Sequence, residues 1–513
     1  MQESHRKAYH VYTELTLADI VREHRRSRPH RTAVVDGKWH LTYGEFDART
    51  DLLAGALAVA GAGHGSRILW IGENSYRVLE LLVAAAKIGA ILCPANWRQS
   101  ADELRFIVAD LEPAVVLWDP SVSSIEPESA PEDGSRWVRC TESEDDEYES
   151  WLSSSSAQYP AEEVEERDPV LLLYTAAFDG RPNGALLSHR ALIAHGAVLA
   201  IQRQIEEGFV FLDSGPMFHV GTMMFATATL MTGGTNVVLR RFDPEIACEL
   251  IERERCQGAM LFPAMISQLV ETNSEGRYDL SSLRFAPADP AWNTMVTADT
   301  SPWGRSEYGY GQTEVAGMLT YHALGIDGQG SHGRPSPLTQ VRIVDPEDRD
   351  VPDGQVGEIV ARGSHLLSGY FNRPELDTEK FRGGWYHTGD LGRREADGTL
   401  SFIGPKLRMI KSGGENIYPA EVERALLAHP DISAAAVIGR PDDDWGQAVH
   451  AVVVIRAKSE EAEPDLIAHV RRLIASYKKP RSIDFVDAIP MRGFVPDYDA
   501  LDSGFGGGGY PGS

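Results

Sequence analysis

The sequence predicts an α/β protein with a large N-terminal domain of layered α/β subdomains plus a small β subdomain, followed by a small α+β C-terminal domain. Three observations predict this organisation. Strand and helix patterns alternate from about residue 30 to Phe262, as in helices packed on parallel strands. Past residue 330 the chain turns to short strands separated by Gly and Asp turns. After Gly404, roughly a hundred residues form a compact α+β pattern, a length that suits a separate domain.

Composition limits the class of protein. At 513 residues the chain is too long for a single core, and 42% hydrophobic with 24% charged residues is ordinary for a globular protein. No apolar run reaches bilayer length, and Met1–His10 is unlike a signal peptide, so we expect a cytoplasmic protein. The net charge of -26 argues against nucleic acid and anionic membranes as partners.

The four cysteines (Cys93, Cys140, Cys248 and Cys256) are scattered, without CxxC or Cys/His ligand spacing. We therefore expect buried thiols and no metal site. Between Glu126 and Asp168 the chain carries fifteen acidic and three basic residues, together with the serine run Ser153–Ser156. This composition predicts a solvated loop or linker and not a binding site.

The N-terminal elements begin with an amphipathic helix over Leu17–His24. A hairpin follows, in which Thr32–Val35 and His40–Thr42 flank Asp36-Gly37. Thr42, with Glu45 three residues on, has the pattern of a capping box that starts a helix to about Val59. The next elements in order are strand Arg67–Gly72, helix Ser75–Ile88, strand Ala90–Pro94, helix Ala101–Asp110 and strand Ala114–Trp118.

After the acidic stretch the alternation resumes with Gly208–Asp213, Asn236–Arg240, Pro244–Arg255 and Gly258–Phe262. The β-rich part contains Val341–Val344, Gly357–Arg362 and Leu400–Phe402. The last unit has helix Pro419–Ala428, strands Ile432–Ile438 and Gln447–Ile455, helix Asp465–Ser476 and strand Ile483–Phe485. These patterns predict one domain over residues 1–405 and a second over 406–513, with a disordered glycine-rich tail from about residue 504.

The stretch Leu171–His189 has the outline of a phosphate-binding loop. An apolar strand leads into a turn that contains Gly180, Pro182 and Gly184, which is where α/β proteins usually hold a nucleotide phosphate. A working loop offers hydroxyl and amide donors and normally a lysine. Here the corresponding positions are Ala176, Ala177, Phe178, Asp179 and, in place of the lysine, Asn183. The loop would hold a triphosphate poorly.

Five further motifs occur in the order typical of one family. The chain from the helix after Thr42 to Pro490 resembles the acyl-CoA synthetase, or adenylate-forming, superfamily. The motifs are Tyr308–Glu314, Gly357–Ile359, Tyr370–Glu375, Trp385–Gly392 and Lys411–Glu423. The resemblance implies an adenylate-forming enzyme fold, in which a small mobile C-terminal domain swings between two catalytic poses. Members make acyl-AMP from an acid and ATP, then transfer the acyl group to CoA.

The residues that serve the ATP half-reaction depart from the family pattern. The family loop resembles YTSGTTGxPKG. The family's C-terminal lysine lies in a pattern like PRNPTGKI, whereas Pro490–Asp497 and the residues that follow it contain no lysine. Pro405 replaces an arginine that usually reaches the ribose, and Leu407 occupies the polar hinge position. Losing a cation that neutralises phosphate charge costs orders of magnitude in rate. Whether Lys406, Arg408 or Lys411 substitutes stays open.

The residues that serve the CoA half-reaction are retained. By resemblance, Asp390 accepts the ribose hydroxyls, Tyr310 stacks on adenine and Thr313 reaches the α-phosphate. Gly311 and Gln312 belong to the same motif, as does Glu314, which helps to hold magnesium in relatives. His219 matches the residue near the acyl carbonyl, and Gly413, Gly414, Glu415 and Tyr418 match the loop that lines the pantetheine tunnel. We expect His219, Thr313 and Gly414 to act in catalysis; Lys478 and Lys479 are weaker candidates for CoA binding.

Loss of the residues for the ATP half-reaction and retention of those for the CoA half-reaction predict a non-adenylating acyl-CoA ligase. It would use CoA and preformed acyl-AMP as substrates, with no requirement for ATP or Mg²⁺, and depend on a separate adenylating enzyme. It resembles the non-adenylating ligase of platensimycin- and platencin-type diterpenoid biosynthesis. Two alternatives stay open: a complete ATP-dependent synthetase with a substitute lysine, and a catalytically silent acyl-adenylate or CoA binding protein. We expect Phe218–Phe225 and Ala286–Asp289 to line the pocket of a small-molecule acyl group, with room for a bulky one beside Gly221.

Overall fold

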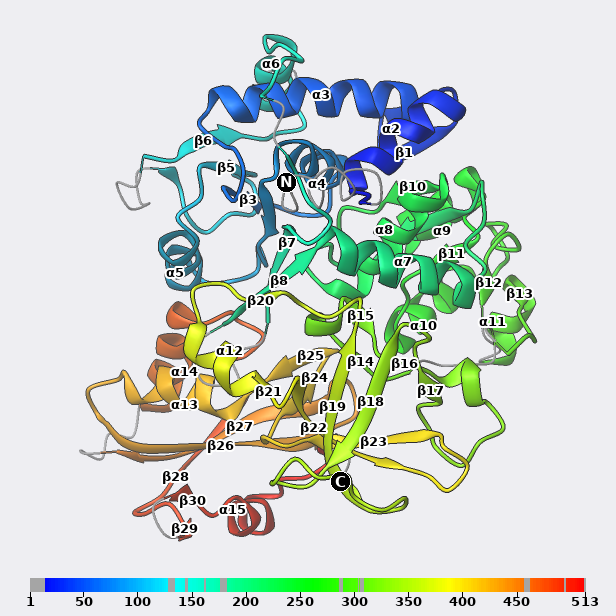
Figure 1. Ribbon diagram of the computed structural model, residues 1–513. Coiled ribbons are helices and arrows are strands. Elements are labelled where there is room, and N and C mark those ends of the chain that lie inside the picture. The colour runs from blue at the N-terminus through cyan, green and yellow to red at the C-terminus, as the bar shows by residue number, and fades with distance from the viewer. Residues whose placement is uncertain are drawn as a thin grey trace, which may run out of the picture.

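The computed structural model describes residues 14–127, 134–143, 146–160, 163–175, 182–285, 289–302, 304, 309–455, 462–492 and 495–511. The N-terminal half of the chain forms two helix-flanked sheets, in the upper part of Figure 1. A smaller antiparallel sheet and the C-terminal sheet lie below them. The predicted mixed α/β class, with a large N-terminal and a small C-terminal part, is confirmed.

The largest sheet has a parallel centre with an antiparallel edge. Strands β7, β4, β3, β5 and β6 run parallel, and β8 pairs antiparallel with both β7 and β20. All four residues of Val115–Trp118 are buried, as expected for a parallel strand covered on both faces. The order across the sheet is β20 (Gly369–Tyr370), β8 (Gly184–Ser188), β7 (Pro169–Tyr174), β4 (Ile91–Pro94), β3 (Arg67–Ile71), β5 (Val115–Trp118) and β6 (Arg136–Arg139).

A second sheet contains the predicted hairpin. Strands β1 and β2 pair antiparallel around Gly37, whose φ of +55° is the left-handed conformation that glycine adopts readily. The other strands pair in parallel with β1 or with one another. The order is β11 (Gly258–Ala259), β9 (Val210–Asp213), β10 (Thr235–Val238), β1 (Thr32–Asp36) and β2 (Trp39–Thr42).

Side-chain caps start several helices where the sequence predicts them. Thr42 and Glu45 form the expected capping box of α3, and Ser75 caps α4. Helices α7 and α8, which pack against each other, were not anticipated from the sequence. The helices of this part are α2 (Leu17–Ser27), α3 (Tyr43–Val59), α4 (Tyr76–Ile88), α5 (Ala101–Leu111), α6 (Glu147–Ser153), α7 (His189–Arg203), α8 (Val220–Thr232), α9 (Pro244–Glu254), α10 (Pro263–Thr272) and α11 (Pro290–Met295).

The predicted β subdomain is an antiparallel sheet that carries the Trp385–Gly392 motif. Its central strand β22 pairs with β19, β21 and β23, so that Asp390 lies opposite Pro405. The strands are β18 (Thr339–Val344), β19 (Val356–Gly363), β21 (Phe381–Arg382), β22 (Trp385–Arg394) and β23 (Leu400–Pro405), and the short helix α12 (Pro374–Lys380) precedes β21.

The C-terminal unit has its own core. The long antiparallel pair of β26 and β27 is covered by α13 and α14, which lie between this pair and α5 in Figure 1. Strand β28 extends the sheet in parallel with β27. The elements are β24 (Ile410–Ser412), β25 (Glu415–Ile417), α13 (Pro419–Leu427), β26 (Ile432–Asp442), β27 (Gly446–Ile455), α14 (Ala462–Leu473), β28 (Ser482–Phe485), β29 (Met491–Arg492), β30 (Val495–Pro496) and α15 (Tyr498–Phe505).

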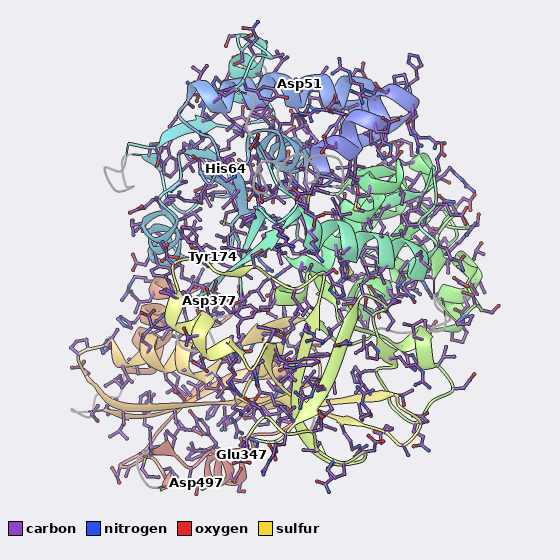
Figure 2. All side chains as sticks on the ribbon, viewed as in Figure 1. Asp51, His64, Tyr174, Glu347, Asp377 and Asp497 are labelled. Carbon is purple, nitrogen blue, oxygen red and sulfur yellow. The ribbon has the colours of Figure 1, made fainter. Side chains whose placement is uncertain are left out.

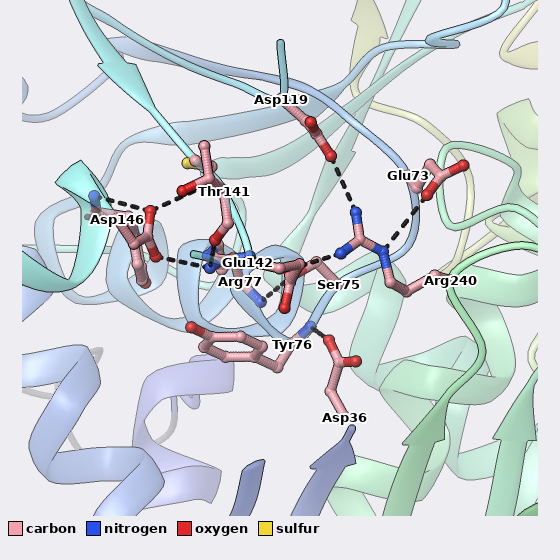
Figure 3. A network of polar contacts seen from close by, with 12 residues as sticks. Asp36, Glu73, Ser75, Tyr76, Arg77, Asp119, Thr141, Glu142, Asp146 and Arg240 are labelled. Atoms are coloured by element: carbon pink, nitrogen blue, oxygen red, sulfur yellow. Dashed lines mark hydrogen bonds and ion pairs between the residues drawn. The ribbon is translucent and has the colours of Figure 1, made fainter. Parts of the chain in front are cut away.

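The acidic stretch is more ordered than its composition suggests. The prediction of a solvated loop is wrong for residues 136–143 and 146–153, which contain β6 and α6 and bury Tyr148 and Leu152. Basic partners explain the difference. Arg77, which is 3% exposed, donates to Asp146 at 2.7 Å and to Glu142 at 3.1 Å (Figure 3). Arg49 is bonded to Glu149 in the same way, at 2.7 Å.

The predicted disorder from about residue 504 is also wrong for residues 504–511, the part of the tail that the structure describes. Helix α15 continues to Phe505, and the glycines after it pack on the C-terminal sheet. Gly508 N donates to Gly439 O at 2.9 Å, and Tyr510 Oη donates to Asp502 at 2.9 Å. Over the described residues we find no helix with the length and apolarity needed to cross a membrane.

Candidate active site

A cavity of about 1720 Å³ lies where the N-terminal sheets, the β subdomain and the C-terminal unit meet. Tyr174, the last residue of β7, lines it and lies near the middle of the molecule in Figure 2. Most of the residues that sequence motifs single out line the same cavity, although they come from distant parts of the chain. They are His219, Tyr310, Gly311, Gln312, Thr313, Glu314, Asp390, Gly413, Gly414, Glu415, Tyr418 and Lys478.

Asp390 and Tyr310 form the centre of the predicted adenylate side. Asp390 Oδ2 accepts hydrogen bonds from Tyr310 Oη at 2.6 Å and from Gln312 Nε2 at 2.7 Å. Burial raises the pKa of Asp390. The ring of Tyr310 stacks on Phe402, with centroids 5.1 Å apart and an interplanar angle of 16°. Phe402 therefore fixes the plane of the ring on which we expect adenine to stack.

Glu314 lies beside this pair in a shell of tyrosines. Its Oε1 accepts a hydrogen bond from Tyr370 Oη at 3.0 Å, and Tyr386 Oη donates to Gln312 Oε1 at 3.0 Å. Burial raises the pKa of Glu314. Among the described residues, His, Cys, Asp and Glu form no cluster of three that could hold a metal.

The residues that flank the degenerate phosphate loop line the cavity. Ala176, Ala177, Phe178 and Asp179 lie outside the described residues, but Thr175 and Pro182 on either side of them line the cavity. Asn183, at the position of the expected lysine, is 1% exposed, and its carbonyl accepts from Thr175 N at 2.9 Å. The described residues on either side of the loop thus lie at the candidate site, and the neutral Asn183 is packed away from solvent.

The acyl side of the cavity is aromatic. Phe211 stacks on Phe225 with centroids 4.9 Å apart, and Phe209 continues the stack. Gly221 lines the cavity as predicted, with Met260 as its neighbour. Asp289 also lines it, whereas residues 286–288 of the predicted lining lie outside the described residues. This aromatic lining is compatible with the predicted pocket for an apolar acyl group.

The Gly413-Gly414 turn joins β24 to β25 and reaches the cavity from the C-terminal unit. Both glycines have positive φ, +57° and +85°. A Cβ atom at Gly413 would lie 2.7 Å from the ring of Trp445, so a side chain at this position would have to displace the Trp445 ring. Backbone can therefore approach a ligand closely here, as the predicted pantetheine tunnel requires.

Glu415 connects this turn to the N-terminal part of the chain. Its carboxylate lies 2.5 Å from Arg98 Nη2 and 3.3 Å from His219 Nε2. Burial alone would raise the pKa of Glu415, but its interactions with His219 and Arg98 outweigh burial and lower the pKa to about 2. Glu415 is therefore an anion at neutral pH that holds the turn against His219.

The two lysines that the sequence suggested for CoA binding both have protein partners. Lys478 is 7% exposed, and its ammonium donates to Glu421 at 2.7 Å and to Glu103 at 2.8 Å. It lines the cavity, and its role in CoA binding stays a prediction. Lys479 does not line the cavity, and its ammonium donates to Ser476 O at 3.1 Å.

The three cations considered as substitutes for the missing lysine have protein partners. Lys406 lies 3.2 Å from Glu358, and Lys411 donates to Asn416 Oδ1 at 2.8 Å. Arg408 is paired with Asp502 of α15 and stacks on Tyr510, its guanidinium carbon 4.0 Å from the ring centroid. Arg408 is absent from the cavity lining, whereas Lys406 and Lys411 belong to it.

Sequence reasoning missed Arg98 and Tyr477, which line the cavity, and Trp445, which lies beside Gly413. Arg98 stacks on Phe218 and on Tyr477, 5.2 Å from each ring centroid. Trp445 is 45% exposed next to the Gly413 turn, and Arg481 lies 4.7 Å from its ring centroid. None of these residues belongs to a local motif, so the sequence alone held no signal for them.

Comparison with known proteins agrees with this geometry. The AMP-binding enzyme family model matches residues 21–371, and the model of the AMP-binding enzyme C-terminal domain matches residues 421–493. The chain is 35% identical over 480 residues to a feruloyl-CoA synthase of an Amycolatopsis species, covering 91% of this chain and 94% of that protein. It is 33% identical over 506 residues to an indoleacetate–CoA ligase of Aromatoleum aromaticum, covering 93% and 95%.

A solved structure of o-succinylbenzoate CoA synthetase from Bacillus subtilis, a double mutant bound to a product analogue, superimposes with a TM-score of 0.80. It is 24% identical, covering 96% of this chain and 99% of that one, and supports the fold alone. Fold and cavity together define an adenylate-forming enzyme with a large N-terminal and a small C-terminal domain. The chain belongs to the AMP-binding enzyme family, among its acyl-CoA ligases.

Proposed function

We propose that this acyl-CoA ligase has lost adenylation and transfers the acyl group of a preformed acyl-AMP to CoA. One observation carries the proposal. The segment that would bear the adenylation lysine contains none, and its α15 is packed on the C-terminal unit with Asp502 paired to Arg408. The phosphate loop, with Asn183 buried in place of a lysine, supports the same reading.

The proposed reaction needs no triphosphate. The thiolate sulfur of CoA attacks the carbonyl carbon of the mixed anhydride, and the carbon–oxygen bond to phosphate breaks. AMP leaves with the electron pair, and the thiol proton passes to solvent. Asp390 and Tyr310 hold the nucleoside, Thr313 donates to the phosphate, and the Gly413-Gly414 turn lets the pantetheine arm approach beside His219.

The acyl donor then comes from a separate adenylating enzyme. The stacked phenylalanines at the acyl side favour an aromatic or polycyclic acid, in keeping with the resemblance to the non-adenylating ligase of platensimycin- and platencin-type diterpenoid biosynthesis. ATP and Mg²⁺ would be dispensable, because acyl-AMP already carries its leaving group.

A complete ATP-dependent synthetase is the second candidate. Lys406 and Lys411 line the cavity, and relatives at 33–35% identity are named as CoA synthases or ligases. In that case one of these lysines would leave its present partner to neutralise the α-phosphate. A silent binding protein, the third possibility, would bind acyl-AMP or CoA without turnover.

The deciding experiment offers the purified chain two sets of substrates. One contains acid, ATP, Mg²⁺ and CoA; the other contains the matching acyl-AMP and CoA, over a panel of aromatic and polycyclic acids. We expect thioester from acyl-AMP only. Thioester and pyrophosphate from ATP plus acid would overturn the proposal, and Lys406→Met and Lys411→Met would then identify the substitute cation. Binding without thioester from either set would favour the silent protein.

A further inference from the structure

Lys478 joins two parts of the chain that are far apart in sequence. Its ammonium lies between Glu421 of α13 in the C-terminal domain and Glu103 of α5 in the N-terminal domain. The three side chains are 9%, 2% and 10% exposed, respectively. A buried ammonium with two buried carboxylates is costly to separate, because each charge would be left without a partner.

A capping box within the N-terminal domain fixes the position of Glu103 independently of Lys478. Glu103 is the third residue of α5, and its Oε2 accepts from Ser100 N at 2.9 Å in a capping box. Its other oxygen, Oε1, accepts from Lys478. Helix α5 therefore presents a preorganised anion to the C-terminal domain.

Further contacts lead from this ion pair to the cavity. Ser100 Oγ donates to Leu473 O at 2.9 Å, and Asn96 Nδ2 lies 3.4 Å from Tyr477 Oη. Arg98, which stacks on Tyr477, reaches Glu415 next to the Gly413-Gly414 turn. The segment Arg98–Glu103 thus contacts the C-terminal domain at two points. Glu103 pairs with Lys478, and Arg98 pairs with Glu415 next to the Gly413-Gly414 turn.

We propose that Lys478 and Glu103 form an interdomain latch that holds the Gly413-Gly414 turn at the acyl carbonyl during transfer to CoA. Lys478 is then a positioning residue, since it acts through the turn and does not touch the reacting atoms. The inference rests on the proposed function in so far as it assigns the latch to the CoA step.

Two matched substitutions separate the latch from ordinary stability. Glu103→Gln removes the charge that crosses the domain interface, and a glutamine still completes the capping box. Glu421→Gln removes a carboxylate from the same ammonium within the C-terminal domain. We expect Glu103→Gln to lower the rate of thioester formation from acyl-AMP about tenfold, with acyl-AMP affinity and the rate of acyl-AMP hydrolysis by water unchanged. Glu421→Gln should keep the wild-type ratio of thiolysis to hydrolysis.

Hydrogen exchange of the peptide over residues 410–418 provides a readout that does not depend on turnover. We expect faster exchange in Glu103→Gln than in wild type, with Glu421→Gln close to wild type in this peptide when measured beside a bound acyl-AMP analogue. Equal exchange and equal thiolysis-to-hydrolysis ratios in wild type and Glu103→Gln would overturn the latch. Wild-type protein that makes no thioester from acyl-AMP would instead overturn the proposed function, and the exchange comparison would still test the latch.

Discussion

Asp390 is the residue that we expect to contact the nucleotide most directly. Both of its hydrogen bonds go to Oδ2, and among the described residues no donor contacts Oδ1. Oδ1 is therefore the acceptor that we expect a ribose hydroxyl to use. Asp390→Asn should weaken AMP binding about tenfold to a hundredfold, because charged acceptors contribute about 1.5–3 kcal/mol. Calorimetric titration with AMP measures this, with Asp345→Asn in the β18–β19 region as the control. An unchanged affinity would remove Asp390 from the site.

Asp36 makes a prediction about stability and pH. Burial raises its pKa from 3.8 to about 6, although Tyr76 N donates to its carboxylate at 3.0 Å (Figure 3). A raised pKa means that the folded state binds the proton more tightly, so this group stabilises most below pH 4 and the stability is lost as pH rises to about 6. Asp36→Asn should raise the free energy of unfolding at pH 7 by about 1–3 kcal/mol. Urea denaturation from pH 4 to 8 checks this; parallel curves for the two proteins would contradict it.

At the scale of single elements, the acidic segment depends on its arginine partners. Asp146 caps α6 and also accepts from Arg77, and its side chain is 4% exposed. Arg77→Met would leave this carboxylate buried and unpaired, at a cost of about 3–5 kcal/mol in the free energy of unfolding. Arg139→Met on the exposed face of β6 serves as the control and should change stability by less than about 0.5 kcal/mol. Equal urea midpoints for the two variants would show that the segment is not anchored through Arg77.

Arg240 shows how such pairs join elements across the sheets. It follows β10 and lies 2.9 Å from Asp119, 2.7 Å from Glu142 and 3.4 Å from Glu73 (Figure 3). These carboxylates come from the end of β5, the acidic segment and the β3–α4 loop. Although Arg240 lines the cavity, its charge is already balanced, which favours a structural role over phosphate binding.

At the scale of the whole molecule, the C-terminal tail (residues 498–511) packs against the C-terminal domain. Tyr510 covers Arg408 and donates to Asp502, and Leu501 is fully buried. Tyr510→Ala should lower the free energy of unfolding of this domain by about 2 kcal/mol, and Tyr510→Phe, which keeps the ring, by about 1 kcal/mol. Differential scanning calorimetry measures both. If truncation after Gly506 left the melting temperature unchanged, the tail would not stabilise the domain, as the prediction of a disordered tail implies.

Local sequence signals determined the fold to a large extent. Capping residues such as Thr42 and Ser75, apolar runs such as Val115–Trp118 and the Asp36-Gly37 turn act within a few residues, so they can be recognised without the rest of the chain. The motifs around Tyr310 and Asp390 predicted family and site together, because their spacing is characteristic of one fold.

The sequence by itself thus determined the fold class, the family and the motif residues that meet in the cavity, but not neighbours such as Arg98 and Tyr477. Only the tertiary structure decided which charges are free to act. Lys478 pairs with Glu103 from a distant helix, Arg408 is covered by the tail, and Glu142 and Asp146 are neutralised by arginines. The reason is physical: helix caps and strand patterns depend on neighbours along the chain, whereas an ion pair depends on partners that only the folded chain brings within about 4 Å.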